Sequence, residues 1–155
     1  MYAETIVNNK EKLRNKVRRK FNKFIQLRDL EVLPNGDIRA KCISCGRKEN
    51  IDISYQLKDW HAGHYFREKG SDKKESVALD EVNVNLQCAK CNKYLSGNES
   101  NYQLGLIRKY GQEEFDNLVI RSNQIKIYSY GELEELDKIY SRKIKEQQER
   151  IGKKW

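Results

Sequence analysis

The sequence is poor in apolar residues and lacks any long hydrophobic run. Hydrophobic residues make up 37% of its 155 residues and charged residues 35%, so apolar residues are fewer than in a typical globular domain. A transmembrane helix needs about 20 consecutive apolar residues, and the first ten residues, MYAETIVNNK, lack the apolar segment of a secretory signal. We therefore expect a cytoplasmic protein with no membrane partner, built as one domain or as a small core with helical arms.

Acidic residues are scarce near the N-terminus, where positive charge is concentrated. The formal net charge is +8, and residues 10–23 hold eight lysines and arginines but only one acid, Glu11. Clustered basic residues bind polyanions because they displace the counterions of phosphate groups, although a solvated helix face has the same composition. The residues expected to contact DNA are Arg14, Arg18, Arg19, Lys20, Lys23 and, further along the chain, Arg67.

The pattern of apolar residues and turn-forming residues predicts short elements between helices. An amphipathic helix is predicted for residues 9–29, because apolar residues recur there at intervals of three and four. The single proline and the following Asn35–Gly36 predict a turn into a short strand that ends near Lys41. Residues 67–76 are polar and predict an exposed loop between two short strands. A later helix is predicted to end at Gly111.

The last predicted helix begins near Gly131 and runs almost to the C-terminus. Its apolar residues follow a spacing close to a heptad, at Leu133, Leu136, Tyr140, Ile144 and Ile151. This stripe fits either packing onto the core of the same chain or an interface with a second copy. A homodimer through this helix is therefore one expectation.

The four cysteines form two CxxC pairs, CISC at residues 42–45 and CAKC at residues 88–91. Four thiolates with this spacing can bind one Zn²⁺ tetrahedrally, and the glycine after the first pair suits the tight turn of a zinc knuckle. Redox-active or unrelated buried cysteines are the alternatives. We predict that a structural zinc ion, which would contribute much of the folding free energy, is bound by Cys42, Cys45, Cys88 and Cys91.

The two histidines, His61 and His64, lie between the cysteine pairs in the segment WHAGHYF. In order along the chain, CISCG, AGHYF, NVNLQCAKCN and GLIRKYGQEEF resemble the NinG (Rap) family of lambdoid phage recombination endonucleases. The resemblance covers roughly residues 21–118 and extends to the wider HNH, or ββα-metal, nucleases. It implies an α+β fold with N- and C-terminal helical extensions around a zinc-stapled, treble-clef-like ββα-metal (HNH) core. In that core a strand pair carries His64, and a helix starts at the second CxxC pair.

The resemblance also implies roles for three polar residues. His64 matches the general base that activates water, Asn83 the central asparagine that orients this histidine, and Asn92 a ligand of the catalytic cation. The alternative for His64 is a structural histidine of the hairpin, hydrogen-bonded to a backbone carbonyl. Independently of any family, an imidazole can accept a proton near neutral pH. A hard divalent cation, here Mg²⁺ or Mn²⁺, stabilises the leaving oxygen of a phosphodiester.

One position departs from the HNH pattern. Many HNH enzymes have an aspartate, which is a metal ligand, directly before the base histidine, and this chain has Gly63 there. NinG proteins typically share the glycine and often have an acid three residues before the histidine, where this chain has His61. In order of preference, His61 binds the cation with Asn92, or Asp59 or Glu81 provides a ligand, or the activity has been lost.

Together these features predict three regions: a basic amphipathic helix (residues 1–30), the zinc-bound core (31–118) and a C-terminal helical extension (119–155). The resemblance implies a divalent-metal-dependent endonuclease that acts on branched DNA recombination intermediates, Holliday junctions and D-loops, in the cytoplasm of the phage host. The alternatives are a non-catalytic zinc module that binds DNA and an HNH nickase of duplex DNA. Four aromatic residues fit either stacking on unpaired bases or packing around the zinc: Trp60, Tyr65, Phe66 and Tyr94.

Overall fold

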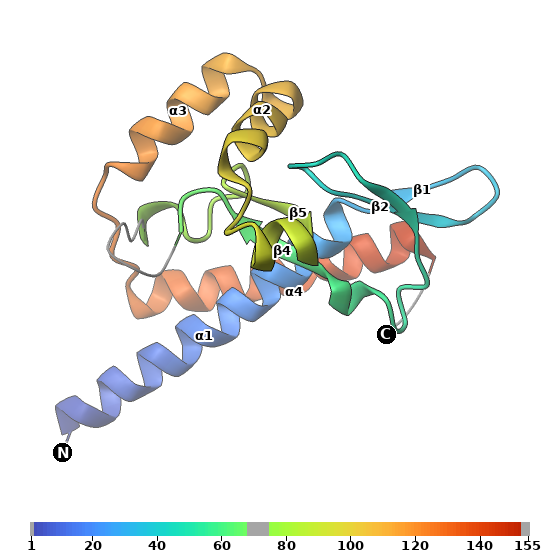
Figure 1. The fold of residues 1–155 in the computed structure, drawn as a ribbon. Coiled ribbons are helices and arrows are strands. Elements are labelled where there is room, and N and C mark those ends of the chain that lie inside the picture. Colours follow the sequence, from blue (N-terminus) through green and yellow to red (C-terminus); the bar gives the residue numbers. More distant parts are fainter. Residues whose placement is uncertain (1, 68–74, 153–155) are drawn as a thin grey trace.

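The structure, a computed structural model, describes residues 2–67 and 75–152 of the chain. The described part has the α+β architecture expected from the sequence, with a two-stranded sheet between two pairs of helices (Figure 1). The helices are α1 (Tyr2–Arg28), α2 (Glu99–Tyr110), α3 (Gln112–Ser122) and α4 (Tyr130–Ile151). The strands are β1 (Glu31–Val32), β2 (Ile38–Lys41), β3 (Lys48–Asn50), β4 (Trp60–His64) and β5 (Val84–Cys88).

Helix α1 begins at Tyr2, earlier than the predicted start near Asn9. The predicted start was wrong because it relied on the apolar stripe alone, whereas residues 2–8 contain no proline or glycine that would end a helix. The stripe itself is confirmed, since Val17, Phe21 and Phe24 are buried. Burial of this stripe holds the second half of α1 against the rest of the molecule.

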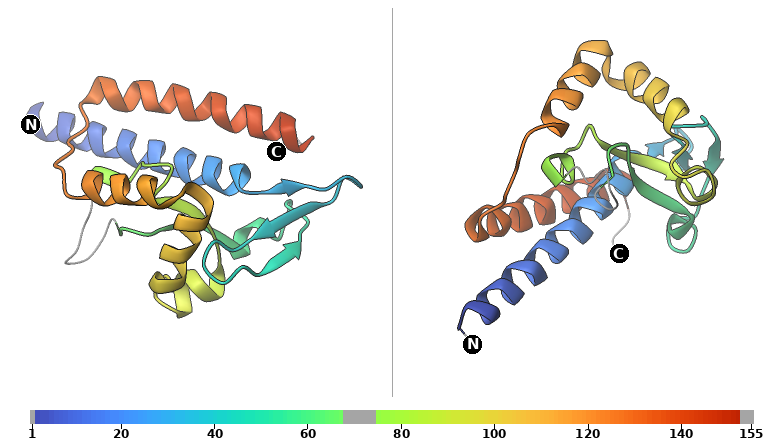
Figure 2. Two further views of the ribbon diagram at one scale, coloured as in Figure 1. Left: turned by 90° about the horizontal axis from the view of Figure 1, so that it is seen from above. Right: turned by 60° about the vertical axis from the view of Figure 1, so that its left-hand side comes forward.

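Helix α4 lies alongside α1 and covers the same side of the central sheet (Figure 2). Leu133 and Tyr140 are buried in one cluster with the apolar residues of α1, and the Tyr140 ring meets the edge of Phe21 at a centroid distance of 5.1 Å. Asp137 of α4 forms ion pairs with Lys16 and Lys20 of α1. The apolar stripe of the last helix therefore packs within the chain, and the homodimer stays a prediction.

Strands β4 and β5 form the central antiparallel sheet. Their register pairs Trp60 with Cys88, His61 with Gln87 and His64 with Val84. Every residue of β5 is buried. Helix α1 packs against the strand pair, and Tyr102 of α2, which lies on the other side (Figure 1), donates to the Gly63 carbonyl at 2.6 Å. The pairing places the histidine segment directly beside the strand that leads into the second cysteine pair.

The turn and the strand predicted between residues 31 and 41 are confirmed. Strands β1 and β2 pair antiparallel around this turn, and β3 extends the sheet. Gly36 adopts a φ of +86° in the turn, which glycine tolerates because it has no Cβ. Strand β2 leads directly into Cys42. We call the turn around Cys42 and Cys45 the first knuckle and the turn around Cys88 and Cys91 the second.

The chain after the second cysteine pair differs from the expected continuous helix. Residues Lys90–Tyr94 form a single π-helical turn. Ser96 and Asn98 then adopt left-handed backbone angles, with φ of +50° and +49°, and α2 begins only at Glu99. A helical segment therefore does start at the second cysteine pair, as expected, but it does not continue into α2, because these two residues interrupt the helical backbone. The predicted end at Gly111 is confirmed.

Helix α3 was not predicted from the sequence. It buries Phe115 and Leu118 in a cluster with Tyr102 and Leu106 of α2. The predicted boundary between core and C-terminal extension, after residue 118, falls inside this helix, and the division into three regions stays a prediction.

The exposed loop predicted at residues 67–76 is described only in part. Residues 68–74 lie outside the described part, while Glu75–Val77 form a short 3₁₀ turn. Among the described helices, none combines the length and the apolar composition needed to cross a membrane.

We predict that Gly105→Ala destabilises the fold. A Cβ at Gly105 would overlap the carbonyl oxygen of Ile43 and lie 3.0 Å from its carbonyl carbon, so α2 would have to move away from the first knuckle. Overpacking of this kind costs about 1–3 kcal/mol, and thermal unfolding should show a lower midpoint. Gly131→Ala is the control, because nothing lies within 4 Å of a Cβ there. An equal midpoint for the two variants would contradict the prediction.

Candidate functional site

The four cysteines converge at one point between the two sheets. Their sulfur atoms all lie within 4.8 Å of one another, and Cys45 Sγ is 3.8 Å from Cys88 Sγ. A tetrahedron with Zn–S bonds of about 2.3 Å has edges of about 3.8 Å, so the observed spacing fits a bound zinc. Cys42, Cys88 and Cys91 are buried. The cluster can therefore bind one zinc ion, as the sequence predicted.

Backbone hydrogen bonds shape both knuckles around the thiols. In the first, the Cys42 N–H donates to the Arg47 carbonyl at 2.9 Å and the Gly46 N–H donates to the Cys42 carbonyl at 3.0 Å. In the second, the Gly97 N–H donates to the Cys91 carbonyl at 2.9 Å. Burial raises the pKa of the Cys42 thiol to about 12, so a nearby cation is needed to stabilise its thiolate.

His64 is the last residue of β4, and its ring is held by a backbone carbonyl. Its Nε2 lies 3.0 Å from the carbonyl oxygen of Ala78. Because a carbonyl oxygen only accepts hydrogen bonds, Nε2 must carry a hydrogen, and in the neutral ring Nδ1 then holds the lone pair. This is the tautomer in which Nδ1 can accept a proton.

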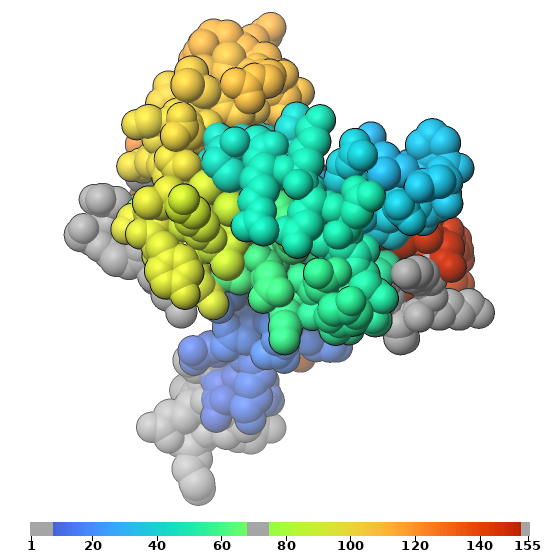
Figure 3. Space-filling model, turned by 45° about the vertical axis from the view of Figure 1, so that its right-hand side comes forward, coloured from blue at the N-terminus to red at the C-terminus, as the bar shows by residue number. Residues whose placement is uncertain are grey.

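A hollow of about 420 Å³, which we call the His64 pocket, lies beside this ring. Its lining includes Arg18, Asn22, His64, Arg67, Asn92 and Ser96. The pocket lies where α1, β4 and the segment after Cys91 meet. In Figure 3 the chain around the second cysteine pair (yellow-green) is at the surface beside the green segment that contains β4, with α1 (blue) below them.

Asn83 is fully buried and ties together the chain on both sides of residues 68–74. Its Oδ1 accepts from the Phe66 N–H at 2.8 Å, and its Nδ2 donates to the carbonyls of Phe66 and Val77 at 3.0 and 2.9 Å. Val77 directly precedes Ala78, whose carbonyl holds the His64 ring. Asn83 is thus linked through the Val77–Ala78 backbone to the carbonyl that holds the His64 ring.

Asn92 and His61 form a hydrogen-bonded pair. Asn92 Nδ2 lies 2.8 Å from His61 Nδ1, so the amide donates and the imidazole accepts. Burial, and then the positive charge of Lys93, lower the pKa of His61, which favours the neutral ring required for this bond. The structure brings the two expected cation ligands together, but the His61 lone pair at Nδ1 is directed at Asn92.

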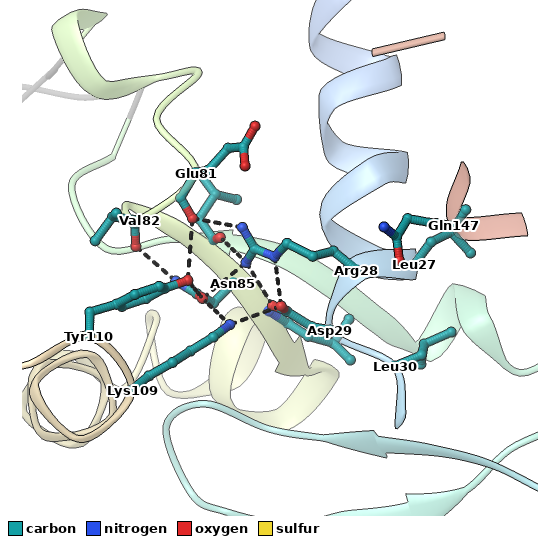
Figure 4. A network of polar contacts seen from close by, with 12 residues as sticks. Leu27, Arg28, Asp29, Leu30, Glu81, Val82, Asn85, Lys109, Tyr110 and Gln147 are labelled. Carbon is teal, nitrogen blue, oxygen red and sulfur yellow. Dashed lines mark hydrogen bonds and ion pairs between the residues drawn. The ribbon is translucent and has the colours of Figure 1, made fainter. Parts of the chain in front are cut away.

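The two alternative acidic ligands lie in different surroundings. Glu81 accepts hydrogen bonds from Tyr140 and Lys143 of α4, and Figure 4 shows its carboxylate turned away from the neighbouring polar network. Asp59 is exposed directly before β4, and its charge acts on His61. Glu81 is therefore already engaged with α4, whereas Asp59 is near the histidine pair.

A buried polar network joins the end of α1 to β5 and α2 (Figure 4). No pattern in the sequence predicted it. The Asp29 carboxylate accepts from Arg28 Nε and from Lys109 Nζ, both at 2.8 Å. Asn85 Oδ1 accepts from Lys109 Nζ at 2.8 Å and from Tyr110 Oη at 2.7 Å. Burial acts to raise the pKa of Asp29, but the hydrogen bond and the charge of Arg28 hold that pKa below its ordinary value. The network fixes the end of α1 against the central sheet.

The basic residues expected to bind DNA divide into three groups. Arg18 and Arg67 line the His64 pocket. Arg14 forms an ion pair with Glu75, and Lys20 forms one with Asp137. Arg19 is exposed and Lys23 half-buried. The basic residues of α1, which are close together in the sequence, therefore have different environments in the fold: one lines the pocket, some form ion pairs within the chain, and others are exposed or half-buried.

Three of the four candidate stacking residues pack inside the fold. Trp60 is buried, and Tyr65 and Phe66 pack edge to face with ring centroids 4.8 Å apart. Tyr94, by contrast, is 80% exposed on the π-helical turn next to Asn92. Tyr94 is therefore the most exposed of the four rings, whereas Tyr65 and Phe66 are half-buried.

Comparison with known proteins identifies similar sequences in phages. The family model described as "NinG: Bacteriophage Lambda NinG protein" matches residues 3–150. "Protein ninG" of Escherichia phage 933W is 30% identical over 125 residues, which cover 81% of this chain and 53% of the phage protein. "Protein ninG" of Escherichia phage lambda is 29% identical over 125 residues, with coverage of 81% and 52%. The chain spans about half the length of these curated relatives, and no solved structure matches significantly.

We predict that the cysteine cluster binds one zinc ion per chain. In Cys42→Ser, bound zinc measured by mass spectrometry should fall well below one per chain, and the thermal midpoint should fall because metal binding contributes folding free energy. Ser54→Ala, at an exposed position away from the knuckles, should keep its zinc. Stoichiometric zinc in Cys42→Ser would contradict the prediction.

Proposed function

Because this chain belongs to the NinG family of bacteriophage lambda proteins, we propose that it is a divalent-metal-dependent endonuclease that cuts branched DNA recombination intermediates, namely Holliday junctions and D-loops. We assign the β4–β5 pair and the second knuckle to an HNH-like, treble-clef-like ββα-metal core. The observation that carries the proposal is the His64 ring, whose Nε2 is fixed by Ala78 inside a pocket that also holds two arginines and Asn92.

The chemistry proposed is hydrolysis of one phosphodiester bond. Nδ1 of His64 accepts a proton from a water molecule, and the oxygen of that water attacks the phosphorus while the bond to the leaving deoxyribose oxygen breaks. The leaving oxygen then takes a proton from solvent water. Arg18 and Arg67 bind the non-bridging phosphate oxygens, since guanidinium groups match phosphate geometry. Asn83 keeps the His64 ring in place through the Val77–Ala78 backbone.

The residues around the pocket fit a hard divalent cation. The Asn92 carboxamide oxygen is a donor of the kind that Mg²⁺ and Mn²⁺ prefer, and few protein ligands suffice because such ions keep most of their waters. A bound Mg²⁺ or Mn²⁺ would stabilise charge on the leaving oxygen. Asn92 is the first residue proposed to hold it.

DNA is the proposed partner in the host cytoplasm. The pocket arginines would bind at the scissile phosphate, and Arg19 and Lys23 would bind the backbone further along α1 without reading sequence. A second copy of the chain is a further proposed partner, because a branched substrate has approximate two-fold symmetry.

One observation favours a second candidate function, a non-catalytic zinc module that binds DNA. Gly63 stands where many HNH enzymes have an acidic metal ligand, and a missing carboxylate weakens cation binding. The same pocket and arginines would then bind a phosphate without cutting it.

We predict that His64→Ala abolishes cutting of a labelled four-way junction. Loss of a general base lowers rates by about 10² to 10⁴-fold, so with Mg²⁺ or Mn²⁺ the wild type should cut and the variant should not. Both proteins should retain equal zinc, which shows that the fold is intact. If neither protein cuts with any divalent cation while both bind the junction, the binding module replaces the nuclease. Equal cutting of a linear duplex would indicate a duplex nickase instead.

We also predict that Tyr94 stacks on an unpaired base at the branch point. Base–aromatic stacking contributes about 1–3 kcal/mol, which corresponds to roughly 5 to 150-fold in Kd. In a His64→Ala background, Tyr94→Ala should weaken binding to a junction or to single-stranded DNA by this factor, measured by fluorescence anisotropy, and Tyr94→Trp should restore it.

The matched control for Tyr94 is Tyr55→Ala, because Tyr55 is 63% exposed but lies before β4, away from the pocket lining. This variant should bind all DNA substrates as the parent does. Equal losses for the two variants, or a loss for linear duplex equal to that for the junction, would rule out stacking by Tyr94.

A further inference from the structure

Gly63 lies against two side-chain carboxamides. A Cβ built on Gly63 would overlap the Oε1 and Cδ atoms of Gln87 and would lie 3.1 Å from Asn92 Oδ1. Gln87 thus fills the space that a side chain at position 63 would enter. Both amide oxygens border this same space, beside the strand that carries His64.

The Gln87 carboxamide is fixed, and its oxygen has no partner. The side chain is fully buried, and its Nε2 donates to Ser44 Oγ at 2.6 Å and to the Gly97 carbonyl at 2.8 Å. Its Oε1 is buried and finds no hydrogen-bond donor among the described residues. A buried carbonyl oxygen without a partner is unfavourable and is uncommon in native structures, where an ion or a water often satisfies it.

The Asn92 carboxamide is oriented by His61. Because Asn92 Nδ2 donates to His61 Nδ1 at 2.8 Å, Asn92 Oδ1 is directed to the other side, where Gly63 lies. Two amide oxygens therefore lie close to each other beside Gly63, and Gln87 Oε1 has no hydrogen-bond donor among the described residues. Carboxamide oxygens are ligands of hard divalent cations.

We propose that Gln87 Oε1 and Asn92 Oδ1 are the protein ligands of a divalent cation, and that Gln87 on β5 supplies the ligand that Gly63 on β4 cannot. His61 is then a positioning residue that holds the Asn92 amide in its ligating orientation. The inference rests on the proposed function, because it names the cation site of that nuclease. It also explains the glycine, since an aspartate at position 63 would collide with Gln87.

The test measures Mn²⁺ binding to the zinc-loaded full chain, from the electron paramagnetic resonance signal of free Mn²⁺. The wild type should bind one Mn²⁺ per chain. Gln87→Ala should lower the affinity tenfold or more, since even residues that only support a ligand change metal affinity by about 10 to 100-fold. Gln124→Ala, at an exposed position, should bind Mn²⁺ as the wild type does. Zinc content and circular dichroism verify that each variant is folded.

A double variant separates a ligand role of Gln87 from a purely structural one. Gly63→Asp alone should bind Mn²⁺ poorly, because the new side chain meets Gln87. Gly63→Asp combined with Gln87→Ala should recover at least the wild-type affinity, because removing Gln87 makes room for a carboxylate ligand on the other strand. If Gln87 is only structural, the double variant should not recover Mn²⁺ binding. That result would overturn the proposal.

The outcomes also separate this inference from the proposed function. Wild-type protein that binds Mn²⁺ through Gln87 but does not cut junctions supports the cation site and overturns the nuclease. Protein that cuts junctions but binds Mn²⁺ equally well in Gln87→Ala supports the nuclease and overturns Gln87 as a ligand. A wild type that binds no Mn²⁺ at millimolar concentration overturns the cation site.

Discussion

The convergence of four thiols is the constraint on which the rest of the structure depends. It joins the end of β2 to the end of β5, across a separation of 43 residues between Cys45 and Cys88. Once the knuckles meet, the Ile43 N–H donates to the Leu86 carbonyl at 2.9 Å, and Gly105 lets α2 pack directly against Ile43. The central sheet and α2 are thus both positioned relative to the cysteine cluster.

A composition with few apolar residues explains why such a link is needed. Among the described residues, the buried apolar side chains form three clusters rather than one core: one around the knuckles, one between α1 and α4, and one between α2 and α3. Small clusters contribute little stability individually. Polar contacts therefore join them, including Asn83 beside the histidines and the Asp29 network between α1, β5 and α2. The candidate site lies where the elements from these clusters meet.

The sequence predicted the parts of the site that depend on residue type and spacing, and missed those that depend on strand register. Two CxxC pairs are sufficient to predict the thiol cluster, and apolar periodicity is sufficient to predict α1 and α4. Gln87 carried no such signal, because it directly precedes Cys88 and looks like an ordinary strand residue. Its proposed role as a ligand depends on its pairing with His61 and on the missing side chain at Gly63. Likewise, left-handed angles at Ser96 and Asn98, where glycine would be the usual signal, hid the break before α2.

The fold also changes how the positive charge of α1 should be understood. In the sequence, the basic cluster suggests one extended surface for a polyanion. In the structure, Asp137 of α4 pairs with Lys16 and Lys20, and Glu75 pairs with Arg14, so three of these cations hold the chain's own helices and loops together. The arginines that line the His64 pocket come instead from distant positions, Arg18 on α1 and Arg67 after β4. If the proposed DNA binding is concentrated at this pocket, it involves few phosphate contacts, and its salt dependence should be weaker than the +8 net charge suggests.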